Sequence, residues 1–200
     1  MPHPPSKKAD SLPRLAITQG DPAGIGPEVI VKALADKSVY QYAQPVVIGS
    51  PSCLEEAMHQ TGIKHELKLL DSVADVREQP DLLQVVDPAK FNASDCKIGQ
   101  VSAACGQASV RYFEAAVQNC LSGHLDGVVT CPINKEAVQA AGYHEDLGHQ
   151  EILARMTGSE LTATLLMTDK LKVAHLSTHK SLAAAVAYVK KPILVEKLKL

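Results

Sequence analysis

Residues 14–28 read Arg14-Leu-Ala-Ile-Thr-Gln-Gly-Asp-Pro-Ala-Gly-Ile-Gly-Pro-Glu28. The apolar start of this segment, Arg14 to Thr18, predicts a short β-strand. Its glycines and the Asp21-Pro22 pair then predict a tight turn. Pro27 suits the first position of a helix that we expect to run to Ala35. A strand, a turn and a helix in this order form the first unit of an α/β fold.

The same alternation of strand and helix continues along the chain. We expect further strands at residues 44–49, 67–70, 83–86 and 127–130, and helices at residues 52–61, 101–121, 135–141 and 150–156. In the longest helix, one buried face is predicted from apolar residues at helical spacing, namely Phe113, Ala116, Val117, Cys120 and Leu121. The pattern predicts an α/β fold with a mostly parallel sheet and flanking helices.

A further strand is predicted in Leu171-Lys-Val-Ala-His-Leu-Ser-Thr-His179, followed by a helix from Ser181. In this interpretation His175 is a core residue inside the strand, and His179 stands at its carboxyl end. Lys135 and His149 lie at similar strand-to-helix transitions. Ligands of open α/β sheets bind at the carboxyl ends of the strands. We therefore expect these polar side chains to reach one crevice, with small-molecule substrates as ligands.

Composition and charge exclude several classes of protein. The chain has 200 residues, of which 46% are hydrophobic and 21% charged, which is ordinary for a globular domain. A formal net charge of -2 without a basic cluster argues against nucleic-acid binding. No apolar stretch approaches the roughly 18 residues that a membrane span requires, and the amino terminus lacks the apolar core of a secretory signal. These features predict a cytoplasmic protein.

The five cysteines are scattered without a Cys-x-x-Cys pair, which is typical of a reducing compartment. Cys131 follows a predicted strand, and we interpret it as a small residue at a tight turn rather than as a nucleophile.

The predicted domain organisation has two parts. Residues 1–13 are expected to form a disordered tail, and residues 14–200 an α/β region. A last helix begins near Pro192 and ends without a capping signal, leaving Ile193, Leu194 and Leu198 with nothing downstream to pack on. We therefore expect a fold that is truncated at the carboxyl terminus, and a chain that self-associates and is inactive alone.

The glycine-rich turn leaves two interpretations open. Glycines at positions 20, 24 and 26 fit neither the dinucleotide fingerprint Gly-x-Gly-x-x-Gly nor the phosphate-binding P-loop. The turn is either a purely structural strand-to-helix connection or a site where an anion meets the amino terminus of the next helix. A phosphotransferase is disfavoured because no Lys-Ser/Thr follows the glycines.

Four motifs together give the chain a family resemblance: the segment Thr18 to Glu28, Thr130-Cys-Pro-Ile-Asn-Lys135, Gly148-His-Gln-Glu151 and Thr178-His179. With these motifs the chain resembles the 4-hydroxythreonine-4-phosphate dehydrogenase family of vitamin B6 and pyridoxal phosphate biosynthesis. The resemblance implies a fold like that of isocitrate and isopropylmalate dehydrogenases, which use NAD without the dinucleotide fingerprint. It also implies a homodimer.

The activity implied is oxidation of a hydroxyl β to a carboxylate, followed by decarboxylation, with NAD and a divalent cation (Zn, Mg, Mn or Co) as cofactors. By the same resemblance His179 is a metal ligand, and His149 and Gln150 bind substrate. We assign Lys135 by inference as a catalytic, anion-directed charge. The family has His-Thr where this chain has His149-Gln150. This departure leaves open a paralogue acting on a phosphorylated four-carbon sugar acid or a carboxylated dihydrodiol, or a noncatalytic remnant.

Overall fold

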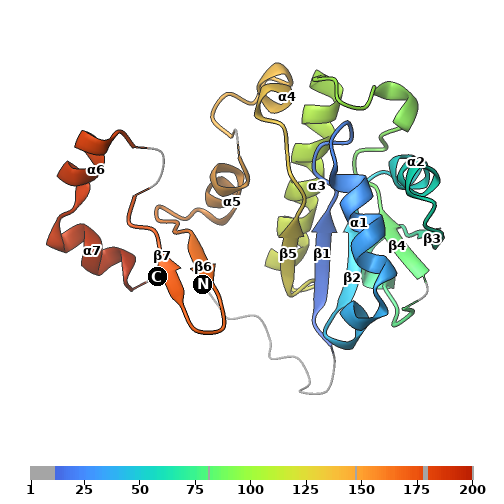
Figure 1. Ribbon diagram of the computed structural model, residues 1–200, viewed down its shortest axis with the longest axis horizontal. Coiled ribbons are helices and arrows are strands. Elements are labelled where there is room, and N and C mark those ends of the chain that lie inside the picture. The colour runs from blue at the N-terminus through green and yellow to red at the C-terminus, as the bar shows by residue number, and fades with distance from the viewer. Residues whose placement is uncertain (1–11, 81, 147, 178–179, 200) are drawn as a thin grey trace. The chain divides into compact units, whose positions relative to one another are not determined.

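The computed structural model describes residues 12–80, 82–146, 148–177 and 180–199 (Figure 1). It divides into two compact units, Met1–Met156 and Thr157–Leu200, which are considered separately below. Most of the tail predicted over residues 1–13 lies outside the described residues.

The first unit is built on a five-stranded sheet in which every neighbouring pair of strands is parallel. The strands are β1 (Arg14–Thr18), β2 (Gln44–Ile48), β3 (Glu66–Leu69), β4 (Leu82–Val86) and β5 (Gly127–Thr130), in the spatial order β3-β4-β2-β1-β5. This arrangement confirms the predicted mostly parallel α/β fold. In its described residues, the connection between β3 and β4 contains only a short 3-10 turn, Val73–Asp75, so no α-helix is seen in this parallel crossover.

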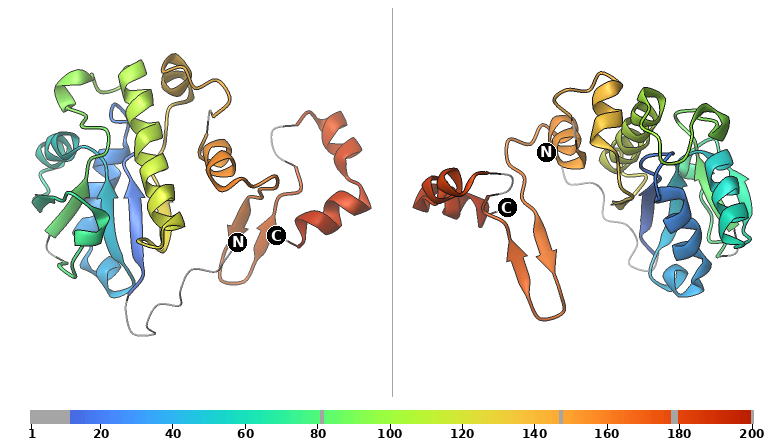
Figure 2. Two further views of the ribbon diagram at one scale, coloured as in Figure 1. Left: turned by 180° about the vertical axis from the view of Figure 1, so that it is seen from behind. Right: turned by 45° about the horizontal axis from the view of Figure 1, so that its top comes forward.

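Helices cover both faces of this sheet. The helices of this unit are α1 (Gly26–Ala35), α2 (Pro51–Thr61), α3 (Ala103–Leu121), α4 (Lys135–Ala140) and α5 (His149–Thr157), with further 3-10 turns at Lys37–Gln41 and Ala93–Asp95. Helices α4 and α5 share an apolar cluster with α3. Helices α1 and α2 lie on one face, and the view from behind in Figure 2 shows α3 across the other. Two apolar clusters fill the layers, one around Ile30, Val47 and Leu54 and the other around Ala16, Val46 and Tyr112.

Side chains that cap the helices explain where several of them begin. Ser50, Ser102 and Asn134 each accept a hydrogen bond from a backbone N–H three residues later, at 3.4, 3.2 and 3.1 Å. Such caps satisfy donors that the first helical turn leaves without partners. These local signals account for starts of α2, α3 and α4 within two residues of the predicted positions.

The predicted buried face of α3 is correct except at its end. Phe113, Ala116 and Val117 are buried and Cys120 is partly buried, but Leu121 is 50% exposed. Leu121 is the last residue of the helix, where the chain already turns away through Ser122 and Gly123 towards β5.

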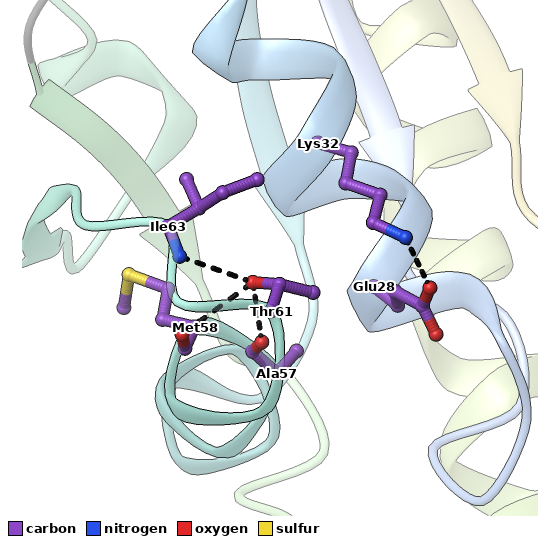
Figure 3. A network of polar contacts seen from close by, with 6 residues as sticks. All are labelled: Glu28, Lys32, Ala57, Met58, Thr61 and Ile63. Carbon is purple, nitrogen blue, oxygen red and sulfur yellow. Dashed lines mark hydrogen bonds and ion pairs between the residues drawn. The ribbon is translucent and has the colours of Figure 1, made fainter.

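The carboxyl end of α2 and the start of α1 carry the polar contacts drawn in Figure 3. Thr61 donates to the carbonyl of Ala57 at 2.8 Å and accepts from the N–H of Ile63. Its hydroxyl thus links the last turn of α2 to the residue that follows Gly62. On α1, Glu28 and Lys32 form an exposed ion pair one turn apart. Exposed pairs of this kind contribute little to stability.

The second unit is a two-stranded antiparallel sheet followed by two short helices. Its elements are β6 (Leu165–Met167), β7 (Lys172–Ala174), α6 (Leu182–Tyr188) and α7 (Lys191–Lys197). No described residue of this unit is buried, and its exposed apolar side chains include Leu166, Val186 and Leu198.

The prediction of a strand reaching His179 is therefore wrong in two respects. The strand ends at Ala174, and it pairs antiparallel with β6 instead of joining the parallel sheet. His175 follows the strand and is partly exposed, so it is not a core residue. The reason is local: Thr168 and Leu171 close a turn through hydrogen bonds in both directions, which folds the two apolar runs into a hairpin.

Two glycines with nearly equal positive φ provide a test of the packing at the end of β1. Gly20 and Gly62 have φ of 70° and 71°. A Cβ on Gly20 would lie 2.2 Å from the carbonyl oxygen of Pro132, whereas a Cβ on Gly62 meets nothing within 4 Å. We expect Gly62→Ala to cost about 1–2 kcal/mol of unfolding free energy, from backbone strain alone. Gly20→Ala should cost about 1–3 kcal/mol more, because the added methyl group overlaps backbone. Urea denaturation followed by circular dichroism measures both, and equal losses would contradict the close contact.

Candidate functional site

The carboxyl ends of β1 and β5 mark the place where the order of strands reverses. β1 lies between β2 on one side and β5 on the other, and Thr18 pairs with Thr130 at the ends of the two strands. Crevices of open α/β sheets form at such reversal points. The loops that follow β1 and β5 share this edge and are therefore the first place to look for a site.

These two loops are bound to each other rather than held apart. The N–H of Asp21 donates to the carbonyl of Pro132 at 2.9 Å, and the N–H of Cys131 donates to the carbonyl of Thr18 at 3.0 Å. Gly26 is also packed tightly against backbone, since a Cβ there would lie 1.9 Å from the carbonyl oxygen of Gln19. The glycines thus permit close packing of backbone, as the structural interpretation of this turn requires.

Two backbone donors of the glycine loop find their acceptors within the loop. Ala23 N–H donates to the carboxylate of Asp21 at 2.9 Å, and Gly24 N–H donates to the carbonyl of the same residue at 3.0 Å. The Asp21 carboxylate therefore occupies one donor that a bound anion could use. These hydrogen bonds favour the structural interpretation at Ala23 and Gly24, whereas the amino terminus of α1 has no side-chain cap.

Asp21 itself is 6% exposed, and burial raises the pKa of its carboxyl above the usual value of 3.8, although the Ala23 N–H opposes that shift. Gln19, next to it, is fully buried and accepts a hydrogen bond from the N–H of Ser50 at 2.8 Å. Sequence spacing gave no indication of either buried polar group.

A cavity of about 550 Å³ opens beside this loop. Its walls come from residues 22–28, from α2 and from residues 93–99, and the polar groups on it include Glu28, Glu56 and Ser94. None of the predicted site residues that the structure describes lines this cavity. It is therefore separate from the positions to which the sequence motifs point.

The burial of Cys131 supports its interpretation as a structural residue. It is 5% exposed, its thiol lies 3.7 Å from the carbonyl oxygen of Gly26, and burial raises its pKa to about 11. A thiol with this pKa is protonated at neutral pH and is a poor nucleophile.

His149 is the first residue of α5 and is half-buried. Its ring packs edge-on against Phe113 of α3, with ring centroids 4.7 Å apart and an interplanar angle of 68°. Its Nε2 is buried and has no hydrogen-bond partner among the described residues. Burial lowers the pKa of His149, with Glu151 acting in the opposite direction, so the ring is neutral at neutral pH. A buried, unpartnered ring nitrogen at a helix amino terminus is suited to an oxygen of a ligand.

Gln150 and Lys135 lie on the same packed group of helices. Gln150 is the second residue of α5 and is half-buried, and Lys135 is the first residue of α4 and is exposed. The helices α3, α4 and α5 share one apolar cluster, to which Val110, Phe113, Val117, Val138 and Ile152 belong. The structure thus attaches His149, Gln150 and Lys135 to one helical support in the first unit.

His179, the predicted metal ligand, lies outside the described residues. Among the described residues, no group of three or more His, Cys, Asp or Glu side chains could hold a metal ion. In the same part of the chain, the structure contains no helix with the length and apolar character of a membrane span.

The chain was compared with known protein families. The sequence profile described as pyridoxal phosphate biosynthetic protein PdxA matches residues 41–200. The chain belongs to this family. The membership confirms the resemblance drawn from the four sequence motifs.

Individual relatives of this PdxA-family chain carry two names. A D-threonate 4-phosphate dehydrogenase of Cupriavidus necator is 38% identical over 94% of this chain and 56% of its own length. A 4-hydroxythreonine-4-phosphate dehydrogenase of Trichlorobacter lovleyi is 34% identical over 88% of this chain and 53% of its own length. The chain therefore spans about half the length of the curated relatives that it matches.

Solved structures agree with the fold. A 4-hydroxythreonine-4-phosphate dehydrogenase from Burkholderia phymatum superposes with a TM-score of 0.87 at 33% identity, covering 95% of this chain and 57% of that one. A terephthalate 1,2-cis-dihydrodiol dehydrogenase from Burkholderia xenovorans LB400 superposes with a TM-score of 0.66 at 28% identity, covering 94% of this chain and 55% of that one.

Because Asp21 is buried, we expect its ionisation to affect the stability of the fold in a pH-dependent way. Because its folded-state pKa is raised, the ionised carboxylate destabilises the fold at neutral pH, and this cost disappears as the pH falls through that pKa towards 3.8. Asp21→Asn retains an oxygen that can accept from Ala23 and should be more stable than the wild type at pH 7, with the difference vanishing below pH 3.8.

Asp36 is the matched control for this measurement, because a hydrogen bond from Ser38 N–H lowers its pKa. Asp36→Asn should be less stable than the wild type at pH 7, and its deficit should be lost in acid as the pH falls through the lowered pKa. Melting temperatures measured between pH 3 and 8 test both signs. A destabilised Asp21→Asn variant at pH 7 would show that the carboxylate has a compensating partner.

Proposed function

We propose that this chain belongs to an oxidoreductase of phosphorylated hydroxy acids, with 4-hydroxythreonine 4-phosphate or D-threonate 4-phosphate as substrate. The observation that supports this proposal is membership of the PdxA family over residues 41–200, together with relatives that are named as dehydrogenases of these two compounds. Both compounds carry a phosphate group, so the site must recognise an anion. Pyridoxal phosphate biosynthesis is the corresponding role for the first substrate.

The two substrates are separate candidates. D-threonate 4-phosphate is a phosphorylated four-carbon sugar acid, the class that the departure at Gln150 leaves open. Relatives named for it reach 41% identity, and the relative named for 4-hydroxythreonine 4-phosphate from T. lovleyi has 34%. Next to the carboxylate, 4-hydroxythreonine 4-phosphate bears an amino group and D-threonate 4-phosphate bears a hydroxyl. A single polar side chain can discriminate between these two groups.

His149 is proposed to hold the anionic end of the substrate. Its neutral ring can donate one N–H, and Nε2 is the buried nitrogen that lacks a partner. Phe113 fixes the plane of the ring through its edge contact. Gln150 follows on the same helical turn, where its amide offers both a donor and an acceptor in place of a hydroxyl. Lys135, exposed at the start of α4, is proposed as a positive charge directed at the substrate.

NAD and a divalent cation are proposed as cofactors on the basis of the family resemblance, with His179 as one ligand of the cation. A bound divalent cation stabilises negative charge on a substrate oxygen. A catalytic cation generally needs about three protein ligands, and the described residues do not supply such a set.

We propose that the protein is a cytoplasmic homodimer. The second unit leaves Leu165, Leu166, Val173 and Leu198 exposed, and a two-stranded sheet is marginally stable in water unless its apolar side chains are covered. All five cysteines are free in the structure, which agrees with a reducing compartment.

Substrate choice should respond to Gln150. We expect Gln150→Thr to change the ratio of kcat/KM for the two phosphorylated acids by roughly tenfold, since one polar contact is worth about 1–3 kcal/mol. Production of NADH by the full-length gene product measures this ratio for each substrate. Gln139→Thr, at an exposed position of α4, is the control and should leave the ratio unchanged. A wild type inactive on both acids would oppose the proposed activity and support the alternative of a noncatalytic remnant.

The role of His179 can be tested separately. His179→Ala should abolish turnover that depends on added divalent cation while the circular dichroism spectrum stays the same, and the loss should appear in kcat more than in KM. His124→Ala, at an exposed position, serves as the control. Full cation-dependent activity in the His179 variant would refute its assignment as a ligand.

A further inference from the structure

One arginine joins the helix that carries His149 to two other parts of the first unit. Arg155 of α5 contacts Asp146 through Nε, with an Nε to Oδ2 distance of 2.5 Å. Its Nη2 contacts Glu114 of α3, with an Nη2 to Oε1 distance of 2.6 Å. We call these three residues the Arg155 clamp.

The clamp joins two carboxylates to one arginine whose side chain is 48% exposed. Asp146 has a side chain that is only 14% exposed, and that of Glu114 is 31% exposed. The two carboxylates occupy different nitrogens of the planar guanidinium, a geometry that a lysine cannot reproduce. Networks of this kind hold their members in place, whereas isolated exposed pairs contribute little.

In the sequence, His149 lies between two residues of the clamp, Asp146 and Arg155. Asp146 precedes His149 by three residues, and Arg155 follows it by six, on the same helix. Glu114 is the neighbour of Phe113, whose ring supports the ring of His149. The clamp therefore ties both ends of the His149 segment to the part of α3 that the imidazole touches.

Arg155 is not suited to bind the anion directly. Two carboxylates already contact its guanidinium, so the clamp as a whole carries a negative charge that repels an anionic substrate. The same residues, Asp146 and Arg155, line a separate cavity of about 370 Å³ with residues 142–145. The role left for the arginine is to hold the segments that it contacts in place.

We propose that Arg155 is a positioning residue, which holds the first turn of α5 against α3 so that His149 is pre-arranged for an anionic ligand. The anion-binding part of this inference rests on the proposed function. The positioning part concerns the environment of His149 and can be measured without catalysis.

The test compares Arg155→Met with Lys32→Met, which breaks the exposed Glu28–Lys32 pair of α1. NMR titration of ¹³C-labelled histidine reports the pKa of His149 in each variant. In Arg155→Met we expect this pKa to rise towards 6.5, because the ring becomes more solvated, and Glu151, the charged neighbour that raises it, remains in place. In Lys32→Met the titration should match the wild type.

Binding of inorganic phosphate gives the second readout. We expect the Kd of the Arg155→Met variant to rise by about tenfold, as a misplaced binding group would cause, and Arg155→Lys to recover only part of the loss. Asp146→Asn should have an effect of the same direction, and should add little when combined with Arg155→Met, because both changes open one network. Asp146→Asn and Glu114→Gln also decide the matter if Arg155→Met does not fold.

The outcomes separate the inference from the proposed function. An unchanged His149 titration together with unchanged phosphate affinity in the Arg155 and Asp146 variants would overturn the inference. A wild type that binds no phosphate and oxidises neither acid would count against the proposed function, while a shifted His149 titration in Arg155→Met would still support the positioning role.

Discussion

The carbonyl oxygen of Pro132 approaches Gly20 so closely that no side chain fits between the loops that follow β1 and β5. Three backbone hydrogen bonds around this point, from Gln19 to Ile48, from Asp21 to Pro132 and from Cys131 to Thr18, hold β1 between its two neighbours. Strands that are fixed at their carboxyl ends also fix where the following helices start. The positions of α1 and α4, and of the side chains that they carry, follow from this contact.

Much of the first unit could be predicted from sequence because its signals are local and agree with one another. Ser50, Ser102 and Asn134 cap helices, and Pro27 occupies a first helical turn, each within a few residues of its effect. The apolar runs between them are short enough to be buried strands. A consistent set of such choices specifies one α/β arrangement, which is why the parallel sheet was correctly expected.

The parts that could not be predicted depend on the choice of partner, which an apolar pattern alone does not specify. A run such as Leu171 to Ala174 is compatible with a parallel or an antiparallel neighbour, and only the turn from Thr168 to Leu171 selects the hairpin. Likewise, Arg155 and Glu114 are 41 residues apart, and periodicity contains no information about their contact. Of the candidate site, the motifs gave His149 and Gln150 but neither Asp21 nor the Arg155 clamp.

The glycine loop and His149 differ in whether the chain itself supplies a hydrogen-bond partner for them. In the loop, the carboxylate of Asp21 accepts from the N–H of Ala23, a donor that could otherwise face a phosphate. At α5 the first residue is instead a neutral imidazole with an unpartnered buried nitrogen. Asp146 and Glu114 contact Arg155, and Glu151 is the carboxylate that raises the pKa of the imidazole. An external anion competes with no internal acceptor for this nitrogen among the described residues. We therefore place the proposed recognition of a phosphorylated acid at His149 and not at the glycine-rich turn, although the turn looks more like a phosphate loop in sequence.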